Sequence, residues 1–318
     1  MKSLFLLGVV CLTACAGAVE SSKLEDKARR TVPVPICLKP LERHGAAGVV
    51  SSLKPDDYWT LVIPAFDTSS STVDAGALDC GGRAVFTEKD LLEADGPRTG
   101  SIPVKLEDAT ISPGPDGFKV VWLRTHRFTD STAGGPLALM RPREGYAEVY
   151  ATGFYRGGVQ TTRFNIERLG PKLLVTATNE GCAGVKPNQN CESAYSIYLM
   201  RAGRLLRAAD FPLDRIEYGT AAGVSGLAQY RLTATPVFAE KNIRVVEQVV
   251  VKDPNQGAVR KSDLERIFTL DPTGKLVASA DSLWTQIMTT RGGTSVPAPG
   301  ANPPVNPPPP PGGVPPRR

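Results

Sequence analysis

Short runs of alternating apolar and polar residues fill most of the chain after residue 117 and predict a succession of β-strands. Arg163–Glu167 alternates cleanly, and Tyr146–Phe154 predicts a strand with two distinct faces, Ala147, Val149 and Ala151 on one and the larger side chains on the other. Runs this short, separated by turn signals about every ten residues, favour a mainly β protein built from antiparallel sheets. The other predicted strands are Phe118–Phe128, Ser193–Arg201, Leu205–Phe211, Gln229–Thr235, Ile243–Val251, Leu264–Leu270 and Lys275–Ala280.

The same pattern leaves several sheet arrangements open: a sandwich, a barrel-like sheet or a long meander. A weak repeat, in which Gly170, Gly203 and Gly274 each precede a cation and an aliphatic run, offers a β-propeller as an alternative. The simpler interpretation is that glycine, cation and leucine mark the return strand of many hairpins.

Before residue 118 the pattern is weaker. Tyr58–Phe66 is apolar and rich in β-formers, so we predict a strand that ends near Pro64. Thr87-Glu88-Lys89-Asp90 resembles a capping box, and it predicts one short helix over Glu88–Glu93 that stops before Gly96-Pro97.

The first residues form an apolar run of signal-peptide length behind Lys2, too short to span a bilayer as a helix. Its end, Leu12-Thr13-Ala14-Cys15, resembles the lipobox of bacterial lipoproteins. That resemblance implies cleavage before Cys15, attachment of lipid such as palmitate to this cysteine and, since Ala16 follows it, an outer-membrane location. An ordinary signal peptide, cut after Ala14, Ala16 or Ala18, is the alternative.

These features divide the chain into four predicted parts. A signal peptide covers residues 1–14, a lipidated flexible tether 15–36, a β domain 37–290 and a disordered tail 291–318, the last because of its many prolines. The β domain could contain two subdomains that divide near residue 157. The formal charge of the whole chain is only +5, with no basic patch that would indicate nucleic-acid binding.

The cysteines agree with export. Beyond Cys15 the mature chain holds Cys37, Cys80, Cys182 and Cys191, an even set that predicts two disulfides with three possible connectivities. Cys182 and Cys191 lie in one loop between predicted strands, and their pairing would leave Cys37 with Cys80. A metal site or a redox centre is the alternative, but the sequence has no C-x-x-C pair to support either.

Signals for catalysis are nearly absent, and we predict neither an enzyme nor a bound cofactor or metal. The two histidines are His44, in a Gly/Ala-rich connector, and His126, on a strand between Arg124 and Arg127. Neither has the spacing of a metal site, and no nucleophile elbow, Walker loop or dinucleotide fingerprint occurs.

Two features could carry binding. Tyr146, Tyr150 and Phe154 share a predicted face that is flanked by arginines, a composition typical of interfaces; the alternative is one side of a sandwich core. Glu247 lies in phase with the valines of Ile243–Val251, which predicts an inward carboxylate that needs a partner such as arginine. A glutamate exposed on an edge strand by a bulge is the plainer explanation.

Together these patterns predict an envelope lipoprotein with a β binding or structural domain. Its expected partners are the membrane, through the lipid, and an envelope protein or the cell wall. One alternative is a carrier of lipid or lipoprotein ligands, with a cavity lined by residues such as Leu173, Val175, Ile197 and Val249. A second is a hydrolase of wall polymers, which would require a cleft that groups His126 with two carboxylates.

Overall fold

The computed structural model describes residues 34–40, 53–87, 92–95, 99–143, 145–222, 224–255 and 257–290. All of them belong to one compact unit of the chain, residues 32–318, whereas the other unit, residues 1–31, lies outside the described ranges. Within them, fifteen strands share one sheet and two more form a small second sheet. The predicted mainly β, largely antiparallel fold is therefore confirmed.

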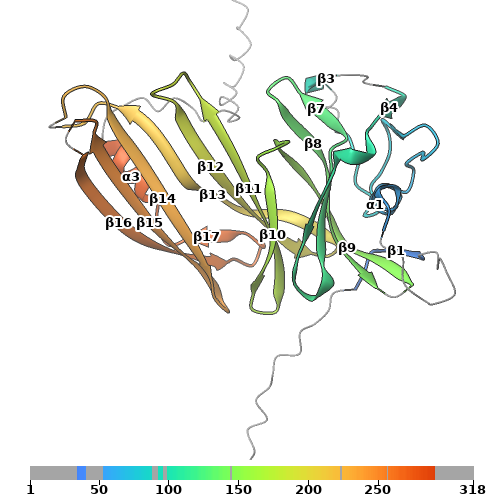
Figure 1. Ribbon diagram of the computed structural model, residues 1–318. Coiled ribbons are helices and arrows are strands. Elements are labelled where there is room, and N and C mark those ends of the chain that lie inside the picture. The colour runs from blue at the N-terminus through green and yellow to red at the C-terminus, as the bar shows by residue number, and fades with distance from the viewer. Residues whose placement is uncertain are drawn as a thin grey trace, which may run out of the picture. The chain divides into compact units, whose positions relative to one another are not determined.

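The C-terminal eight strands of the large sheet form a meander in which each strand pairs antiparallel with the next (Figure 1). Gly170, Gly203 and Gly274 lie in the tight turns of this meander with positive φ, a conformation that glycine adopts without strain. The weak repeat therefore marks hairpin returns within one continuous sheet. The strands are β10 (Arg163–Leu169), β11 (Lys172–Ala183), β12 (Asn190–Arg201), β13 (Arg204–Gly219), β14 (Ala228–Phe238), β15 (Asn242–Asp253), β16 (Gly257–Leu270) and β17 (Leu276–Ala278).

The N-terminal strands of the large sheet run in the order β5–β6–β8–β9, with β1 added to β9 and β7 to β8. They join the meander where β9 meets the start of β13. Gly153 permits this close approach, because a Cβ there would lie 2.7 Å from the carbonyl oxygen of Leu205. The elements are β1 (Cys37–Pro40), β3 (Ala94–Asp95), β5 (Ala109–Pro113), β6 (Lys119–Leu123), β7 (His126–Phe128), β8 (Thr132–Arg143) and β9 (Tyr146–Gly158), with the small sheet β2 (Thr72–Asp74) and β4 (Ser101–Pro103) and the short helices η1 (Leu106–Asp108) and η2 (Pro115–Gly117).

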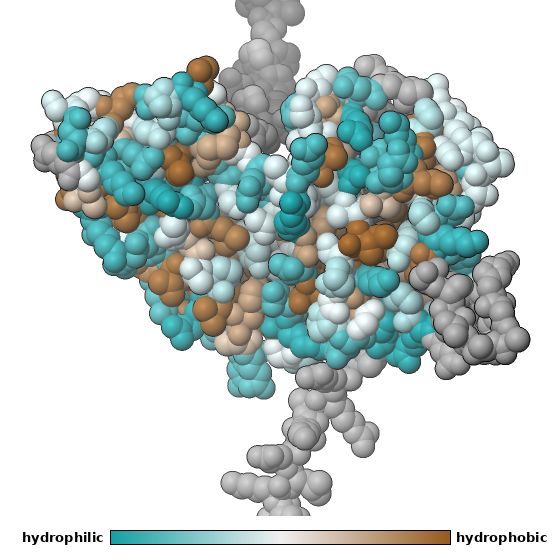
Figure 2. Space-filling model, viewed as in Figure 1, coloured by the Kyte–Doolittle hydropathy of each residue, from teal (hydrophilic) through white to brown (hydrophobic). Residues whose placement is uncertain are grey.

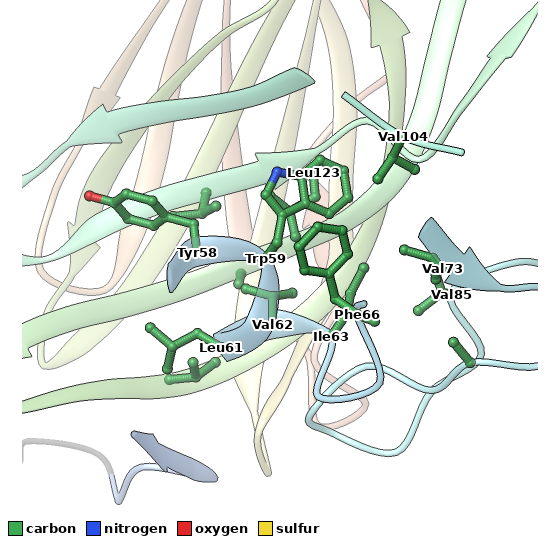
Figure 3. Packing of buried hydrophobic residues seen from close by; sticks show 14 of the residues in the cluster. Tyr58, Trp59, Leu61, Val62, Ile63, Phe66, Val73, Val85, Val104 and Leu123 are labelled. Carbon is green, nitrogen blue, oxygen red and sulfur yellow. The ribbon is translucent and has the colours of Figure 1, made fainter. Parts of the chain in front are cut away.

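The predicted strand at Tyr58–Phe66 is wrong, because most of it is helix α1 (Pro55–Val62). Proline occupies the first turn, and the Asp57 carboxylate accepts a hydrogen bond of 2.8 Å from the Lys54 N–H, which satisfies one free backbone donor. The helix buries its apolar residues at helical spacing against the sheet (Figure 3): Tyr58, Trp59, Leu61 and Val62.

Three other elements differ from the sequence prediction or lie partly outside the described residues. Phe118–Phe128 is two strands, β6 and β7, which the segment Arg124-Thr125 separates. Most of the predicted helix Glu88–Glu93, residues 88–91, lies outside the described residues. Helix α3 (Leu283–Thr290) was not predicted.

The hydrophobic core forms layers on both faces of the sheet. Alternate residues of β6, β8 and β9 pack beneath α1 on one face and against β10 and β11 on the other. The cluster on the β10 and β11 side contains residues from before and after position 157, near which the sequence suggested a division into two subdomains. The far face of β11 and β12 packs with β13 to β17, and α3 covers β14 and β15.

Candidate functional site

A β-bulge divides the predicted aromatic face of β9. Leu139 of β8 lies opposite Ala151 and Met140 lies opposite Val149, so Tyr150 is an extra residue. Val149 packs beneath α1, whereas Tyr150 and Ala151 both pack toward β10 and β11. The prediction of one continuous face is therefore wrong.

Tyr146 precedes the bulge and Tyr150 forms it, and both lie on one side of the strand. Phe154 follows the bulge and lies on the other side. The Phe154 ring stacks 6.0 Å from the His126 ring, which in turn contacts Phe86 in the cluster beneath α1. Tyr146 and Tyr150 thus share one side of the strand, and Phe154 does not.

Tyr150 anchors a compact charged cluster on its side of the sheet. Its hydroxyl donates to the Glu148 carboxylate and accepts from Arg141 Nη2 at 2.8 Å. Arg143 Nε lies 2.9 Å from Glu148 Oε2, and the Arg141 guanidinium lies 4.8 Å from the centre of the Phe118 ring. Among the described residues, two cations therefore share one carboxylate, which leaves an excess of positive charge.

Burial is the main cause that raises the pKa of Tyr150 to about 12, and the hydrogen bond to Glu148 raises it further. Tyr150 therefore stays neutral at ordinary pH and keeps its proton as a donor. The hydroxyl holds Glu148 in place for the arginines.

The Tyr150 ring also lines a groove of about 360 Å³ between the start of β1 and the β12–β13 turn. Most of the groove is apolar, and exposed apolar side chains lie beside it: Val34 is 83% exposed and Leu38 is 60% exposed. Tyr150 is the residue that the groove shares with the charged cluster, since neither Arg141 nor Arg143 lines the groove. A site that joins an apolar lining to a few polar groups suits a ligand or peptide with both characters. The lining residues are Val34, Pro35, Ile36, Tyr150, Met200, Ala202 and Gly203.

Sequence patterns missed this groove because its wall, Val34–Ile36, reads as the end of a flexible tether. The structure holds that segment in two ways. The Ile36 N–H donates to the Val149 carbonyl at 2.7 Å, and the next residue, Cys37, forms a disulfide with Cys80.

Both predicted disulfides, Cys37–Cys80 and Cys182–Cys191, are present. The second joins directly opposite residues of β11 and β12. The predicted lipid attachment residue, Cys15, lies outside the described residues, as does His44.

At the other end of β9, Arg156 belongs to a second charged cluster. Its guanidinium lies 3.6 Å from the centre of the Phe128 ring and makes two ion pairs of 2.8 Å, to Glu93 and Asp130. Hydrogen bonds from Thr132 and Arg156 lower the pKa of Asp130, although burial opposes them. Among the described residues, two carboxylates therefore face one guanidinium in this cluster.

His126 is buried among aromatic rings. Its Nδ1 lies 2.9 Å from the Thr125 hydroxyl, and its ring is within 5.4 Å of those of Phe86 and Phe128. The neighbouring Arg124 and Arg127 both pair with one carboxylate, Asp108.

Glu247 is buried, as the alternation of its strand predicts, and the explanation of an exposed edge glutamate is wrong. It is only 1% exposed, and Arg266 Nη1 lies 2.5 Å from Oε1. Its other oxygen accepts a hydrogen bond of 2.6 Å from the Leu283 N–H at the first turn of α3. Glu247 therefore fixes the helix to the sheet.

The four residues proposed to line a carrier cavity do not lie together. Leu173 and Val175 belong to the cluster between β6, β8, β9 and β11, Ile197 to the cluster on the far face of β12, and Val249 to the cluster under α3. Each is filled core, so a carrier would need a different site.

The described residues contain no group of three or more histidine, cysteine, aspartate or glutamate side chains that could hold a metal ion. None of their helices has the length and apolar character needed to cross a membrane.

Comparisons of the chain with known protein families, with curated proteins and with solved structures find no match.

Proposed function

We propose that this chain is a lipid-anchored protein of the bacterial outer membrane whose β domain is a binding module. One observation supports the export step most strongly. Cys37, Cys80, Cys182 and Cys191 are all paired in disulfides, which form and persist in oxidising compartments. The lipobox-like segment ending at Cys15 supplies the anchor.

The groove beside β1 is the proposed binding surface. Val34 follows Cys15 by only 19 positions, so the groove would stay within about 65 Å of the lipid even on a fully extended chain. Tyr150 lines the groove and accepts a hydrogen bond from Arg141, so the proposed binding surface extends from the groove to the cations around Glu148. An envelope protein or a wall polymer with apolar and anionic groups fits this chemistry.

The anchor is tested by labelling cells with an alkyne-bearing fatty acid and isolating the membranes. Wild type should be labelled, sediment with membranes and begin at Cys15 by mass spectrometry. Cys15→Ser should lose the label and remain uncleaved. Cys11→Ser is the matched control, because it removes a cysteine from the same segment and should still be labelled.

A mature N-terminus at another residue without acyl groups would overturn the anchor. Export is tested separately by trapping free thiols in native material. Recovery of the four later cysteines in reduced form would overturn it.

A carrier of lipid or lipoprotein ligands is the second candidate, favoured by the apolar lining of the groove. Extraction of the native protein with organic solvent and mass spectrometry of the extract should then recover a lipid. Met200→Gln should reduce the recovered amount, whereas Val185→Gln, at an exposed apolar residue elsewhere, should not. An extract without lipid would dismiss the carrier.

A further inference from the structure

Strand β16 presents an open edge to solvent. On one side it pairs with β15 along its length, but on the other β17 pairs only with Phe268–Leu270 (Figure 1). In the described part of the chain, no strand pairs with the outer edge between Gly257 and Arg266. An open edge of this kind is a template for another strand.

The hydrogen bonds of Ile267 show which way the backbone groups on this edge point. Its N–H donates to the Ser279 hydroxyl at 3.1 Å and its carbonyl accepts from the Ser279 N–H at 2.9 Å, so both groups face away from β15. The register with β15 is unbroken from Arg260 to Thr269. By alternation, Lys261, Asp263 and Glu265 also present their N–H and C=O groups outward.

The side chains of these residues lie on the solvent face. Lys261, Asp263 and Glu265 are about half exposed or more, and hydrophilic residues predominate over this part of the surface in Figure 2. Along the edge the charges change sign, from Arg260 and Lys261 to Asp263 and Glu265.

We propose that a second copy of this chain pairs with β16, antiparallel and edge to edge, about a two-fold axis at Ser262. In such a pair one residue lies opposite its own copy, and residues equally far from it on either side oppose each other. With Ser262 at the centre, Lys261 lies opposite Asp263 of the second copy, and the same contact occurs twice. Arg260 then lies opposite Leu264.

Other registers on the same edge set like charges against each other. A two-fold axis at a charged residue places that residue opposite its own copy, which applies to Arg260, Lys261, Asp263 and Glu265. A centre at Leu264 places Asp263 opposite Glu265. Because like charges directly opposite are destabilising, only the register centred on Ser262 is free of this conflict among centres from Arg260 to Glu265, where the strand is regular.

This pairing goes beyond the proposed function and does not depend on it. Its first test is cysteine cross-linking of the full chain, purified in detergent. Ser262→Cys should form a disulfide-linked dimer, because opposite residues in an antiparallel pair have Cβ atoms about 5 Å apart. Glu265→Cys is the control on the same edge, since its copy would lie several residues away along the partner strand.

The second test adds charge reversal to Ser262→Cys. Asp263→Lys or Lys261→Asp alone creates two like-charge contacts and should lower the initial rate of cross-linking about tenfold. The double reversal, Lys261→Asp with Asp263→Lys, should restore it. Circular dichroism and the thermal midpoint of each variant check that the fold is intact.

A dimer that forms with Glu265→Cys but not with Ser262→Cys would overturn the register. Folded Ser262→Cys protein that stays monomeric, or a double reversal that fails to restore cross-linking, would overturn the proposal.

Discussion

Two glutamates, Glu148 and Glu247, each lie on a strand beside arginine, yet their surroundings differ. Glu247 is almost completely buried, and its partners are one arginine and one helix N–H. Glu148 lies nearer the surface, where Arg141, Arg143 and the Tyr150 hydroxyl share it. Arg143 is itself 49% exposed.

The difference lies in the balance of charge and hydrogen bonds. Both Glu247 oxygens are used and its charge is matched by Arg266, so the pair can do little except hold α3 against the sheet. Among the described residues at Glu148, one carboxylate faces two cations, and Tyr150, which bonds to it, also lines an apolar groove. A balanced buried pair is typical of a structural role, whereas the proposed binding role rests on the unbalanced pair near the surface.

The largest expected effect is that of Glu247→Ala. It leaves Arg266 buried without its counter-charge and α3 without its contact, so the free energy of unfolding should fall by about 3–5 kcal/mol. Urea denaturation followed by circular dichroism measures this. Glu265→Ala, which breaks the exposed pair with Arg244, is the control and should cost less than about 1 kcal/mol.

Glu148→Ala should cost less than Glu247→Ala, about 1–2 kcal/mol in the same assay. Arg141 keeps its hydrogen bond to Tyr150 and its contact with Phe118 after the change. A larger loss for Glu148→Ala than for Glu247→Ala would reverse the comparison.

Tyr150→Phe should cost about 1 kcal/mol at pH 8, from the lost hydrogen bonds. The folded pKa of Tyr150 is raised from 10.0 to about 12, so its contribution is complete below pH 10 and disappears as pH rises toward 12. The difference in unfolding free energy between wild type and variant should therefore shrink between pH 8 and pH 11. Denaturation curves at both values measure it, and a difference that grows with pH would contradict the assignment.

Arg143→Gln should have the smallest effect on stability, within about 0.5 kcal/mol, because the side chain is half exposed. It should nevertheless weaken binding of a short alkyl phosphate severalfold and leave binding of the alcohol of equal length unchanged. Calorimetric titration of both ligands separates the contribution of the cations around Glu148 from that of the apolar groove. Equal weakening of both would assign Arg143 to packing.

The prediction for Glu247 succeeded because β15 is regular. Its register with β14 is unbroken from Ile243 to Val251, so alternation in the sequence matches alternation in space. The face of β9 could not be predicted in the same way. The bulge at Tyr150 arises from the pairing with β8, which no local pattern reveals.

The helices show a similar limit. The residues of α1 favour strands, but Pro55 and Asp57 begin a helix and burial beneath the sheet completes it. Helix α3 depends on Trp284 packing on β14 and β15 and on Glu247, which lies 36 residues earlier. Contacts this distant in sequence are decided by tertiary structure.

The bridge from Cys37 to Cys80 also determines how the domain would bear mechanical load. Tension on the chain ahead of Val34 would first strip the main-chain bond from Ile36 to Val149 and would then reach the covalent sulfur link. From Cys80, whose N–H donates to the Val62 carbonyl, the force passes into the segment packed around α1. The short first strand therefore cannot be peeled away residue by residue, and a domain pulled from this end would yield only when its core gives way.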